Sequence, residues 1–336
     1  MNDSYPVSNS YAVNESDLVT PGLVTLGETL GLLVADDVGP LAFARGMRLS
    51  MGGAESNVAI GVARLRVAAT WIGRLGRDPV GDLIERHLLA ERVRCIVRRD
   101  DAPTAIMLRE RRTGTSSNVT YYRHGSAGSH LNPEDLPDGV VEKAGVLHLT
   151  GITPALGPGP AAAVREAMRR ARAAGVPVSV DLNFRSRLWS AAAAAPVFRE
   201  LAAGADMLFA GDDEARIALE IADPADATPE QLAEGLAGLG PSEVVVKRGR
   251  HGATARIDGE LVDVPPVPVQ AVDSVGAGDA FVAGYLAGRL AGREPRDRLS
   301  TAAVTGALAV TVPGDWEALP RPHELSLLTA EEDVQR

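Results

Sequence analysis

The stretch that decides the fold is residues 176–183, Val-Pro-Val-Ser-Val-Asp-Leu-Asn, in which an apolar run ends abruptly in polar residues. Similar runs alternate with helix-forming segments: strands are predicted at 146–149, 176–180, 207–209 and 243–246, and helices at 160–174, 191–203 and 229–239. Short apolar strands that alternate with helices are typical of an α/β fold, in which a parallel sheet lies between two helical layers. Ligands bind beyond the carboxyl ends of such strands, so the polar residues there predict one ligand-binding edge.

The N-terminal part of the chain extends this pattern. Strands are predicted at 23–28, 30–35 and 70–73, and helices at 58–65 and 80–90. Residues 104–110 and 117–123, joined by the polar turn 111–115, have the composition of two antiparallel strands. We expect a small sheet that covers a site, with strands drawn from about 30–50 and 95–125. Residues 1–20 and 326–336 are expected to be tails around one domain, 21–325.

The composition excludes several classes of function. The 336 residues, 45% of them hydrophobic, suffice for a large core. The net charge is −10 and there are two lysines, Lys143 and Lys247, against 32 arginines, so no basic tract is available for nucleic acid or an anionic membrane. The single cysteine, Cys95, excludes a disulfide framework and a cysteine-based zinc cluster. With no apolar stretch of about 20 residues and no signal-peptide pattern, we expect a cytoplasmic protein.

A turn of small residues, Asp273-Ser-Val-Gly-Ala-Gly-Asp279, leads directly into the apolar, helix-prone segment 280–286. The free N–H groups and the positive dipole end of the helix start make this turn a site for an anion such as phosphate. The carboxylate of Asp279 would repel a phosphate unless it accepts a proton from a hydroxyl that is being phosphorylated. The alternative is that Asp279 caps the helix.

Other polar residues could bind the hydroxyl and carboxylate groups of a ligand. Gly52-Gly53 makes a close-approach turn at a helix start, and the Asn57 amide can donate to and accept from a sugar hydroxyl. A helix cap with a packing glycine pair is the alternative. Arg123 and Arg185 lie at strand ends, where a planar guanidinium can bind a carboxylate through two hydrogen bonds. Their alternative is a surface salt bridge.

Four separated motifs resemble, in order and spacing, those of the ribokinase-like (PfkB) carbohydrate kinases. They are Gly52-Gly53 with Asn57, then 181–189, 244–252 and 273–279, and the resemblance covers about residues 23–320. Within that family, residues 121–129, 151–155 and 181–189 are most similar to 2-keto-3-deoxygluconate kinases. The resemblance implies a three-layer α/β/α sandwich with a mostly parallel central sheet and a small β-sheet lid.

The resemblance also implies roles at the phosphate end of a site. Asp279 would be the catalytic base, and the N–H groups of Gly276, Ala277 and Gly278 would face the γ-phosphoryl group of ATP. As a carboxylate at a helix N-terminus, Asp279 is expected to be ionised at neutral pH and to be a weak base. The residues assigned to the nucleotide are Asp212, Lys247, Gly249 and Gly252, although Lys247 has the alternative of a plain strand-end lysine.

A magnesium ion and the sugar complete the expected site. Mg²⁺ would bridge nucleotide oxygens. Of the family's Asn-x-x-Glu motif this sequence keeps only the glutamate, Glu214, which would contact the ion indirectly. The resemblance implies that both arginines named above bind the substrate carboxylate and keto group. Met107 occupies the place of a substrate-touching tyrosine in many relatives, and strand alternation leaves open which of Tyr121 and Tyr122 faces the site. Asp315 would touch a sugar hydroxyl, with a solvated turn as the alternative.

The expected function is that of an ATP-dependent kinase which phosphorylates 2-keto-3-deoxygluconate on its 6-hydroxyl by in-line transfer. The alternatives are a PfkB-type kinase for a neutral sugar such as fructose or ribose, a kinase for another keto sugar acid, and a catalytically silent sugar or nucleotide sensor. A dinucleotide-dependent oxidoreductase is disfavoured, because Gly27-Glu28-Thr29 lacks the G-x-G-x-x-G turn. We also expect a homo-oligomer, for instance a dimer through the edges of the covering sheet.

Overall fold

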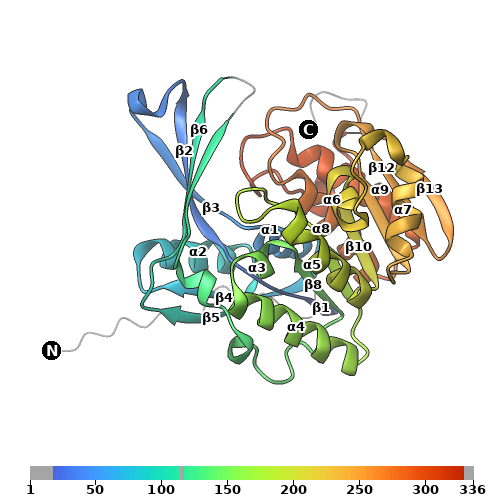
Figure 1. Cartoon of the computed structure of the whole chain (residues 1–336). Coiled ribbons are helices and arrows are strands. Elements are labelled where there is room, and N and C mark those ends of the chain that lie inside the picture. Colours follow the sequence, from blue (N-terminus) through green and yellow to red (C-terminus); the bar gives the residue numbers. More distant parts are fainter. Residues whose placement is uncertain (1–17, 114–116, 329–336) are drawn as a thin grey trace.

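The fold combines a nine-stranded sheet with a separate four-stranded sheet (Figure 1). The computed structural model describes residues 18–113 and 117–328. The large sheet has the order β13-β12-β11-β10-β9-β8-β1-β4-β5, and the small sheet has the order β3-β2-β6-β7. The predicted tails and the predicted turn at 111–115 fall partly outside the described residues.

The elements follow the predicted order, with longer strands than expected near the N-terminus. The strands of the large sheet are β1 (Val19–Leu26), β4 (Val67–Gly76), β5 (Arg94–Asp100), β8 (Val146–Thr150), β9 (Val178–Asp181), β10 (Met207–Gly211), β11 (Glu243–Lys247), β12 (Ala253–Ile257) and β13 (Glu260–Val264). Those of the small sheet are β2 (Leu30–Val38), β3 (Met47–Gly52), β6 (Ile106–Arg111) and β7 (Asn118–Tyr122). The helices are α1 (Ala54–Arg64), α2 (Pro79–Ala90), α3 (Ile152–Ala155), α4 (Pro158–Ala173), α5 (Ala191–Gly204), α6 (Asp212–Leu219), α7 (Pro229–Ala237), α8 (Ala277–Leu290) and α9 (Pro295–Ala309).

The large sheet separates two hydrophobic cores, which confirms the predicted α/β/α sandwich. One core contains side chains of α1, α2, α8 and α9, and the other contains side chains of α4, α5, α6 and α7. Every neighbouring pair from β11 to β5 is parallel, whereas β12 and β13 are antiparallel additions at one edge. Strands such as β8 are buried on both faces, which explains their uninterrupted apolar sequence. Within residues 18–113 and 117–328, none of the helices combines the length and apolar character that a membrane span requires.

Helix α8 is held in place by close packing between small residues. A Cβ atom at Gly61 of α1 would lie 2.6 Å from the Cβ of Ala283, and one at Gly284 would lie 2.8 Å from the Oγ1 of Thr305 in α9. Only glycine permits both approaches, so α8 is buried along most of its length between its two neighbours. This packing fixes the point at which α8 begins, and therefore the position of the anion-binding turn.

The small sheet stands at one side of the large one and projects away from it (Figure 1). β6 and β7 form the predicted antiparallel pair, and β2 lies between β3 and β6. The predicted lid range 95–125 began too early, because Arg94–Asp100 is β5, which pairs in parallel with β4 and extends the large sheet. An edge strand is exposed along one side, so its sequence resembles that of a strand in a small covering sheet.

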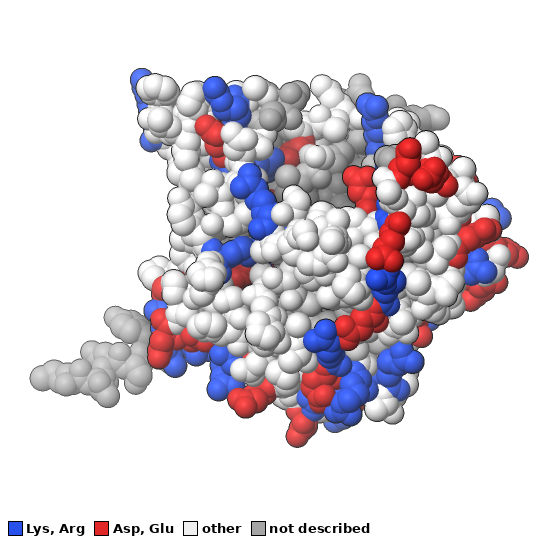
Figure 2. All heavy atoms as spheres, viewed as in Figure 1, with Lys and Arg blue, Asp and Glu red and all other residues white. Residues whose placement is uncertain are grey.

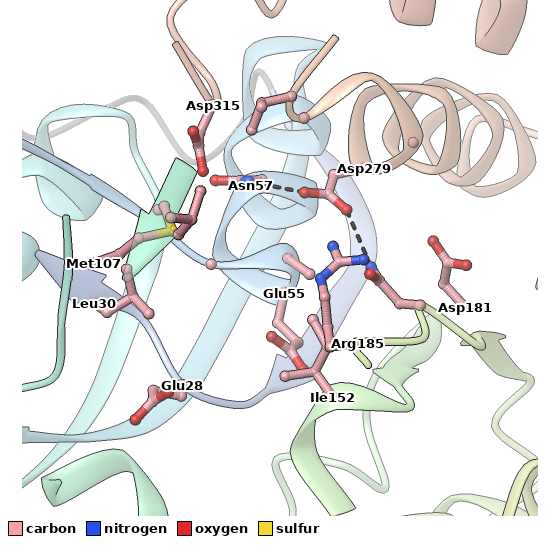
Figure 3. Close-up of a pocket in the computed structure, with 18 of the residues that line it drawn as sticks. Glu28, Leu30, Glu55, Asn57, Met107, Ile152, Asp181, Arg185, Asp279 and Asp315 are labelled. Carbon is pink, nitrogen blue, oxygen red and sulfur yellow. Dashed lines mark hydrogen bonds between the residues drawn. The ribbon is translucent and has the colours of Figure 1, made fainter. Parts of the chain in front are cut away.

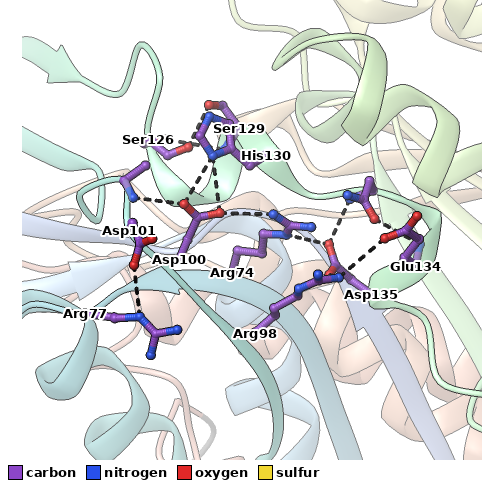
Figure 4. A network of polar contacts seen from close by, with 12 residues as sticks. Arg74, Arg77, Arg98, Asp100, Asp101, Ser126, Ser129, His130, Glu134 and Asp135 are labelled. Atoms are coloured by element: carbon purple, nitrogen blue, oxygen red, sulfur yellow. Dashed lines mark hydrogen bonds and ion pairs between the residues drawn. The ribbon is translucent and has the colours of Figure 1, made fainter.

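A polar network anchors the chain where it returns from the small sheet (Figure 4). The guanidinium of Arg74, on β4, donates to Asp135 at 2.7 Å and to Asp100 at 3.0 Å. Arg98 adds a hydrogen bond to Asp135 at 3.2 Å, and His130 lies 3.2 Å from the Asp100 carboxylate. The network ties the segment that follows β7 to the last two strands of the large sheet.

Candidate active site

A cleft of about 430 Å³ lies between the small sheet and the carboxyl ends of the parallel strands (Figure 3). Most of the residues predicted to bind substrate, nucleotide or metal line it: Gly52, Gly53, Asn57, Met107, Tyr121, Arg123, Arg185, Glu214, Lys247, Gly276, Gly278, Asp279 and Asp315. Four other predicted residues lie outside its described lining: Asp212, Gly249, Gly252 and Ala277. Residues of sequence segments more than 200 positions apart therefore meet at the edge that the strand pattern predicted.

The start of α8 has the geometry of an anion site. Gly276 precedes the helix with φ 74°, and a Cβ atom there would lie 1.9 Å from the carbonyl oxygen of Asp315, so only glycine fits. The first N–H groups of an α-helix have no partners within the helix. A Cβ at Gly278 would lie 3.4 Å from the Nζ of Lys247. The turn therefore brings backbone N–H groups and an ammonium group to one point.

Asp279 is a stronger base than its place at a helix N-terminus predicted. Its carboxylate is buried in the cleft and accepts hydrogen bonds from Nδ2 of Asn57 at 2.8 Å and from Nδ2 of Asn183 at 3.4 Å. Burial is the largest influence on its pKa and raises it to about 6, although the Asn57 hydrogen bond and the Arg185 charge oppose the rise. The expected weak base is thus corrected, because desolvation outweighs these groups that favour the charged form.

Asp315 is a second buried carboxyl in the cleft. Its Oδ1 has no hydrogen-bond partner among the described residues. Burial, the Asp279 carboxylate and the Glu317 carboxylate raise its pKa to about 7. A Cβ at Gly52 would lie 2.4 Å from Oδ2 of Asp315, which explains this glycine of the predicted pair. The buried position rejects the alternative of a solvated turn, and the contact of Asp315 with a sugar hydroxyl stays a prediction.

Lys247 is paired with a carboxylate that the sequence analysis did not assign to the site. Its Nζ donates to Asp181 at 2.6 and 2.8 Å, and Asp181 is only 1% exposed. Burial lowers the pKa of Lys247, but the carboxylates of Asp181 and Glu214 raise it and prevail. The ammonium is therefore charged and held beside the α8 turn, and its contact with a nucleotide stays a prediction.

Glu214 lines the cleft, and both of its carboxylate oxygens accept hydrogen bonds from the backbone. It caps α6, since its carboxylate accepts from the N–H of Gly211 at 2.6 Å and from the N–H of Phe184 at 2.8 Å. The second bond holds the loop that carries Asn183 and Arg185. In the part of the chain that the structure describes, no group of three or more His, Cys, Asp or Glu residues is arranged to hold a metal ion.

The glycines predicted to lie under the nucleotide are explained first by backbone geometry. Gly249 has φ 54° and Gly252 has φ 84°, both in the turn that follows β11. A Cβ at Gly252 would lie 2.0 Å from the carbonyl oxygen of Val264 on β13. Asp212 is the first residue of α6, and burial raises its pKa. These residues follow the carboxyl ends of β10 and β11, and their nucleotide contacts stay a prediction.

The two predicted substrate arginines differ in their partners. Arg123 forms an ion pair of 2.5 Å with the buried carboxylate of Glu28, and its guanidinium lies 5.2 Å from the ring centroid of Tyr121. Glu28 also accepts from the hydroxyl of Ser126 at 2.6 Å. Tyr121 lines the cleft while Tyr122 is 65% exposed, so alternation places Tyr121 inward. The charge of Arg123 is already neutralised within the protein.

Arg185 keeps its charge available for a ligand. Its Nη1 donates to the carbonyl oxygen of Phe184 at 3.2 Å, and among the described residues no carboxylate forms an ion pair with it. The side chain is exposed on the cleft wall and lies near enough to Asp279 to lower the pKa of that carboxyl. Of the two arginines, Arg185 is the one that a substrate carboxylate would neutralise.

An ion pair between the lid and the anion turn was not predicted. Nη2 of Arg109, on β6, donates to Oδ1 of Asp273 at 2.7 Å, and Asp273 also accepts from the N–H groups of Val275 and Gly314. Burial favours the neutral form of Asp273, but these bonds outweigh it and its pKa is lowered. Strand alternation could have found Arg109, which lies two residues after Met107 and hence on the same face.

Glu55 is another residue that the sequence analysis missed. It is 1% exposed, and its Oε1 accepts hydrogen bonds of 2.6 Å from the hydroxyls of Thr150 and Thr153. Burial raises its pKa despite these bonds. Its position, two residues after the glycine pair and at the start of α1, was the available hint. Glu55 holds the ends of α1, β8 and α3 together beneath the cleft.

This fold and this site define an α/β kinase with a β-sheet lid. The chain belongs to the pfkB family of carbohydrate kinases, which it matches over residues 21–322.

Curated relatives include kinases of keto sugar acids and of a neutral sugar. The chain is 35% identical to 2-dehydro-3-deoxygalactonokinase of Haloferax volcanii, over 91% of this chain and 96% of the relative. It is 34% identical to 2-dehydro-3-deoxygluconokinase of Bacillus subtilis, over 93% and 97%. A fructokinase of Klebsiella pneumoniae is 35% identical over 82% and 90%.

Solved structures have the same fold. A PfkB protein of Polaromonas sp. JS666 matches with a TM-score of 0.82 and 34% identity, over 91% of this chain and 99% of that one. The 2-dehydro-3-deoxygluconokinase of Thermotoga maritima matches with a TM-score of 0.83 and 26% identity, over 91% and 97%. A putative ribokinase II of E. coli, in complex with ATP and Mg²⁺, matches with a TM-score of 0.82 and 25% identity, over 92% and 98%.

Proposed function

We propose that this protein is an ATP-dependent kinase that phosphorylates the primary hydroxyl of 2-keto-3-deoxygluconate and yields the 6-phosphate. One observation carries the proposal: the buried carboxylate of Asp279, at a helix N-terminus, lines the same cleft as the unpaired guanidinium of Arg185. The first suits a hydroxyl that becomes a nucleophile, and the second suits a carboxylate at the other end of a small molecule.

In the proposed reaction the substrate hydroxyl attacks the γ-phosphorus of ATP in line with the bond to the departing ADP. Asp279 accepts the hydroxyl proton, the new oxygen–phosphorus bond forms, and the bond to the β,γ-bridging oxygen breaks. A pKa near 6 suits this task, because the carboxylate is ionised at neutral pH yet retains a useful affinity for a proton. The N–H groups of residues 276–278 and the ammonium of Lys247 would stabilise the charge on the transferred group.

The residues present fit a triphosphate with magnesium. The glycine turn leaves room for backbone N–H groups to approach phosphate oxygens, and Lys247 lies beside it. Glu214, on the cleft wall, would contact the hydrated ion only indirectly, and the ion would otherwise be bound by the nucleotide itself. When bound, the ion neutralises charge on the phosphates. The small sheet covers the cleft and would exclude water that competes as an acceptor.

The choice of sugar acid rests on the cleft and on the named relatives. Met107 packs with Leu30 and Leu32, so this wall offers an apolar contact where a tyrosine would offer a hydroxyl. An apolar wall suits the 3-deoxy carbon, which carries no hydroxyl. The relative named 2-dehydro-3-deoxygalactonokinase makes the C4 epimer the second candidate substrate. A neutral sugar is disfavoured, because it would leave Arg185 without a partner.

The proposal is tested by a coupled assay of ADP release with ATP, Mg²⁺ and a panel of acceptors. The panel contains 2-keto-3-deoxygluconate, its C4 epimer, gluconate, fructose and ribose. We expect the highest kcat/KM with a 2-keto-3-deoxy acid. A higher kcat/KM with fructose or ribose would mean that the acceptor is a neutral sugar. Binding of ATP without turnover of any acceptor would favour the alternative of a catalytically silent sensor.

We further propose that the protein is a homodimer through its small sheet. Large apolar side chains are exposed on the strands of this sheet or on the connection between β2 and β3: Val38, Phe43, Met47, Leu49 and Tyr122. Pairing two such surfaces would remove them from water. Light scattering should give the mass of a dimer for the native chain and of a monomer for a Phe43→Ser, Leu49→Lys variant. A native monomer would refute this assembly. The cytoplasmic location stays a prediction.

A further inference from the structure

A second hollow adjoins the cleft on the side of the substrate arginines. It has a volume of about 870 Å³ and lies between β7, the residues that follow it, the end of α3 and the loop 184–188. It shares Val119, Tyr121, Arg123 and Arg185 with the cleft, so the two spaces are adjacent. We call it the arginine chamber. Figure 2 shows basic side chains beside the junction of the small sheet with the rest of the molecule.

The arginine chamber has one sign of charge. Its described lining contains Arg123, His124, Arg185 and Arg187 and no Asp or Glu, although the whole chain has a net charge of −10. Arg123 is neutralised by Glu28, whereas no carboxylate among the described residues forms an ion pair with Arg185 or Arg187. Two uncompensated guanidinium groups thus border one hollow in an acidic protein.

Arg187 was not among the predicted site residues. It follows Arg185 by two positions in a segment that is not a strand, because Asn183 has φ 43° and residues 186–188 form a turn. Both side chains line the arginine chamber. Arg187 is absent from the described lining of the catalytic cleft and therefore borders only the chamber.

We propose that the arginine chamber is the entrance through which the anionic acceptor is recruited, and that Arg187 is its steering residue. The proposal rests on the proposed function, in that it takes the acceptor to be a carboxylate. A hollow lined by one sign of charge with low-dielectric walls concentrates the field and raises the local concentration of the opposite ion. Arg185 then binds the carboxylate in the cleft, and Arg187 raises the frequency with which it arrives.

The chamber is assigned to the acceptor because the nucleotide-side groups are elsewhere. Neither Lys247 nor the turn 276–278 belongs to its described lining, whereas Lys247, Gly276 and Gly278 line the cleft. The Michaelis constant for ATP therefore serves as an internal control. Steering by an exposed charge is also screened by salt, with a Debye length of about 10 Å at 0.1 M and about 3 Å at 1 M.

The test measures kcat and both Michaelis constants of full-length Arg187→Gln, Arg187→Glu and Arg187→Lys at low ionic strength and in about 0.5 M KCl. The matched control is Arg296→Gln on α9, an exposed arginine without an ion pair among the described residues and with the same loss of charge. We expect the KM for the sugar acid to rise about three- to tenfold in Arg187→Gln and more in Arg187→Glu. Arg187→Lys should resemble the wild type, and high salt should abolish the differences.

Each contrary outcome has a distinct meaning. If the wild type phosphorylates the sugar acid and all Arg187 variants match Arg296→Gln, the recruiting role is wrong and the proposed function stands. A rise in KM that salt does not reduce, or a rise in the KM for ATP alone, also overturns recruitment by the chamber. If the wild type phosphorylates only neutral sugars, the proposed function and the recruiting role both fail.

Discussion

The charged groups at the two ends of the cleft differ in whether they have partners within the protein. At the phosphate end, the cation Lys247 is paired with Asp181, and the carboxylate Asp273 beside the anion turn is paired with Arg109 of the lid. At the acceptor end, Arg185 and Arg187 border open space with no ion pair among the described residues. Ion pairs within the protein hold the shape of a site, whereas a charged group without a partner can pair with an opposite charge on a ligand.

The carboxyl groups of Asp279 and Asp315 also line the cleft. Both are buried carboxyls without a cationic hydrogen-bond partner among the described residues, and burial raises the pKa of one to about 6 and of the other to about 7. A buried carboxylate that lacks a cation is costly, so it binds a proton more readily than one in water. The comparison teaches that the proposed base lies where the protein has left a charge incompletely compensated.

The largest effect is expected at this uncompensated carboxylate. Asp279→Asn keeps the size of the side chain but removes the proton acceptor, so kcat should fall about a thousandfold. The KM for ATP should change little, because the N–H groups of the turn remain. Steady-state kinetics with the sugar acid measure both constants. Near-normal turnover in Asp279→Asn would disprove its role as the base.

The next largest effect is expected at the unpaired arginine. Arg185→Gln removes charged hydrogen bonds to the substrate carboxylate, so kcat/KM for the sugar acid should fall about a hundredfold. Arg123→Gln should have a smaller effect on substrate binding, since Glu28 already occupies that guanidinium. Equal losses of kcat/KM in the two variants would contradict the distinction between paired and unpaired arginines.

A smaller loss of rate is expected when the lid is separated from the anion turn. Arg109→Gln leaves Asp273 buried without a cation, so kcat should fall about tenfold and the free energy of unfolding by about 3 kcal/mol. Denaturant unfolding and steady-state kinetics test the two effects. Arg111→Gln, on the same strand but half-buried and without an ion pair among the described residues, is the control and should change neither. A loss of stability with unchanged kcat would show that the pair serves folding alone.

The smallest effect is a shift in pH dependence. A protonated Asp279 cannot accept a second proton, so activity should be lost as the pH falls through about 6. Asn57→Ala removes a donor that favours the ionised form, so the pKa of Asp279 should rise and the acid limb should move up by about one pH unit. The profile of kcat/KM against pH gives the midpoint independently of the amplitude. A limb that stays in place would mean that another group titrates.

Local sequence was sufficient for most of the fold. The alternation of buried strands with helices predicted the parallel sheet and its helical layers, because each strand that is covered on both faces has an uninterrupted apolar sequence. The same logic failed at β5, where an edge strand has the half-exposed pattern of a lid strand. β12 and β13 were not predicted, since short antiparallel additions at an edge carry little pattern of their own.

The sequence by itself determined which residues gather at the site, because strand order and the glycine turns place Gly52, Asn57, Arg185, Lys247 and Asp279 at one sheet edge. Only the tertiary structure decided the charge state of that site. Contacts between residues far apart in the chain, such as Glu28 with Arg123 and Asp181 with Lys247, decide which arginine is neutralised and which lysine gains a partner. They also decide which carboxyl group is buried away from water. Electrostatic energy depends on the distance between charged groups and on their burial, and neither quantity can be determined from the local sequence pattern.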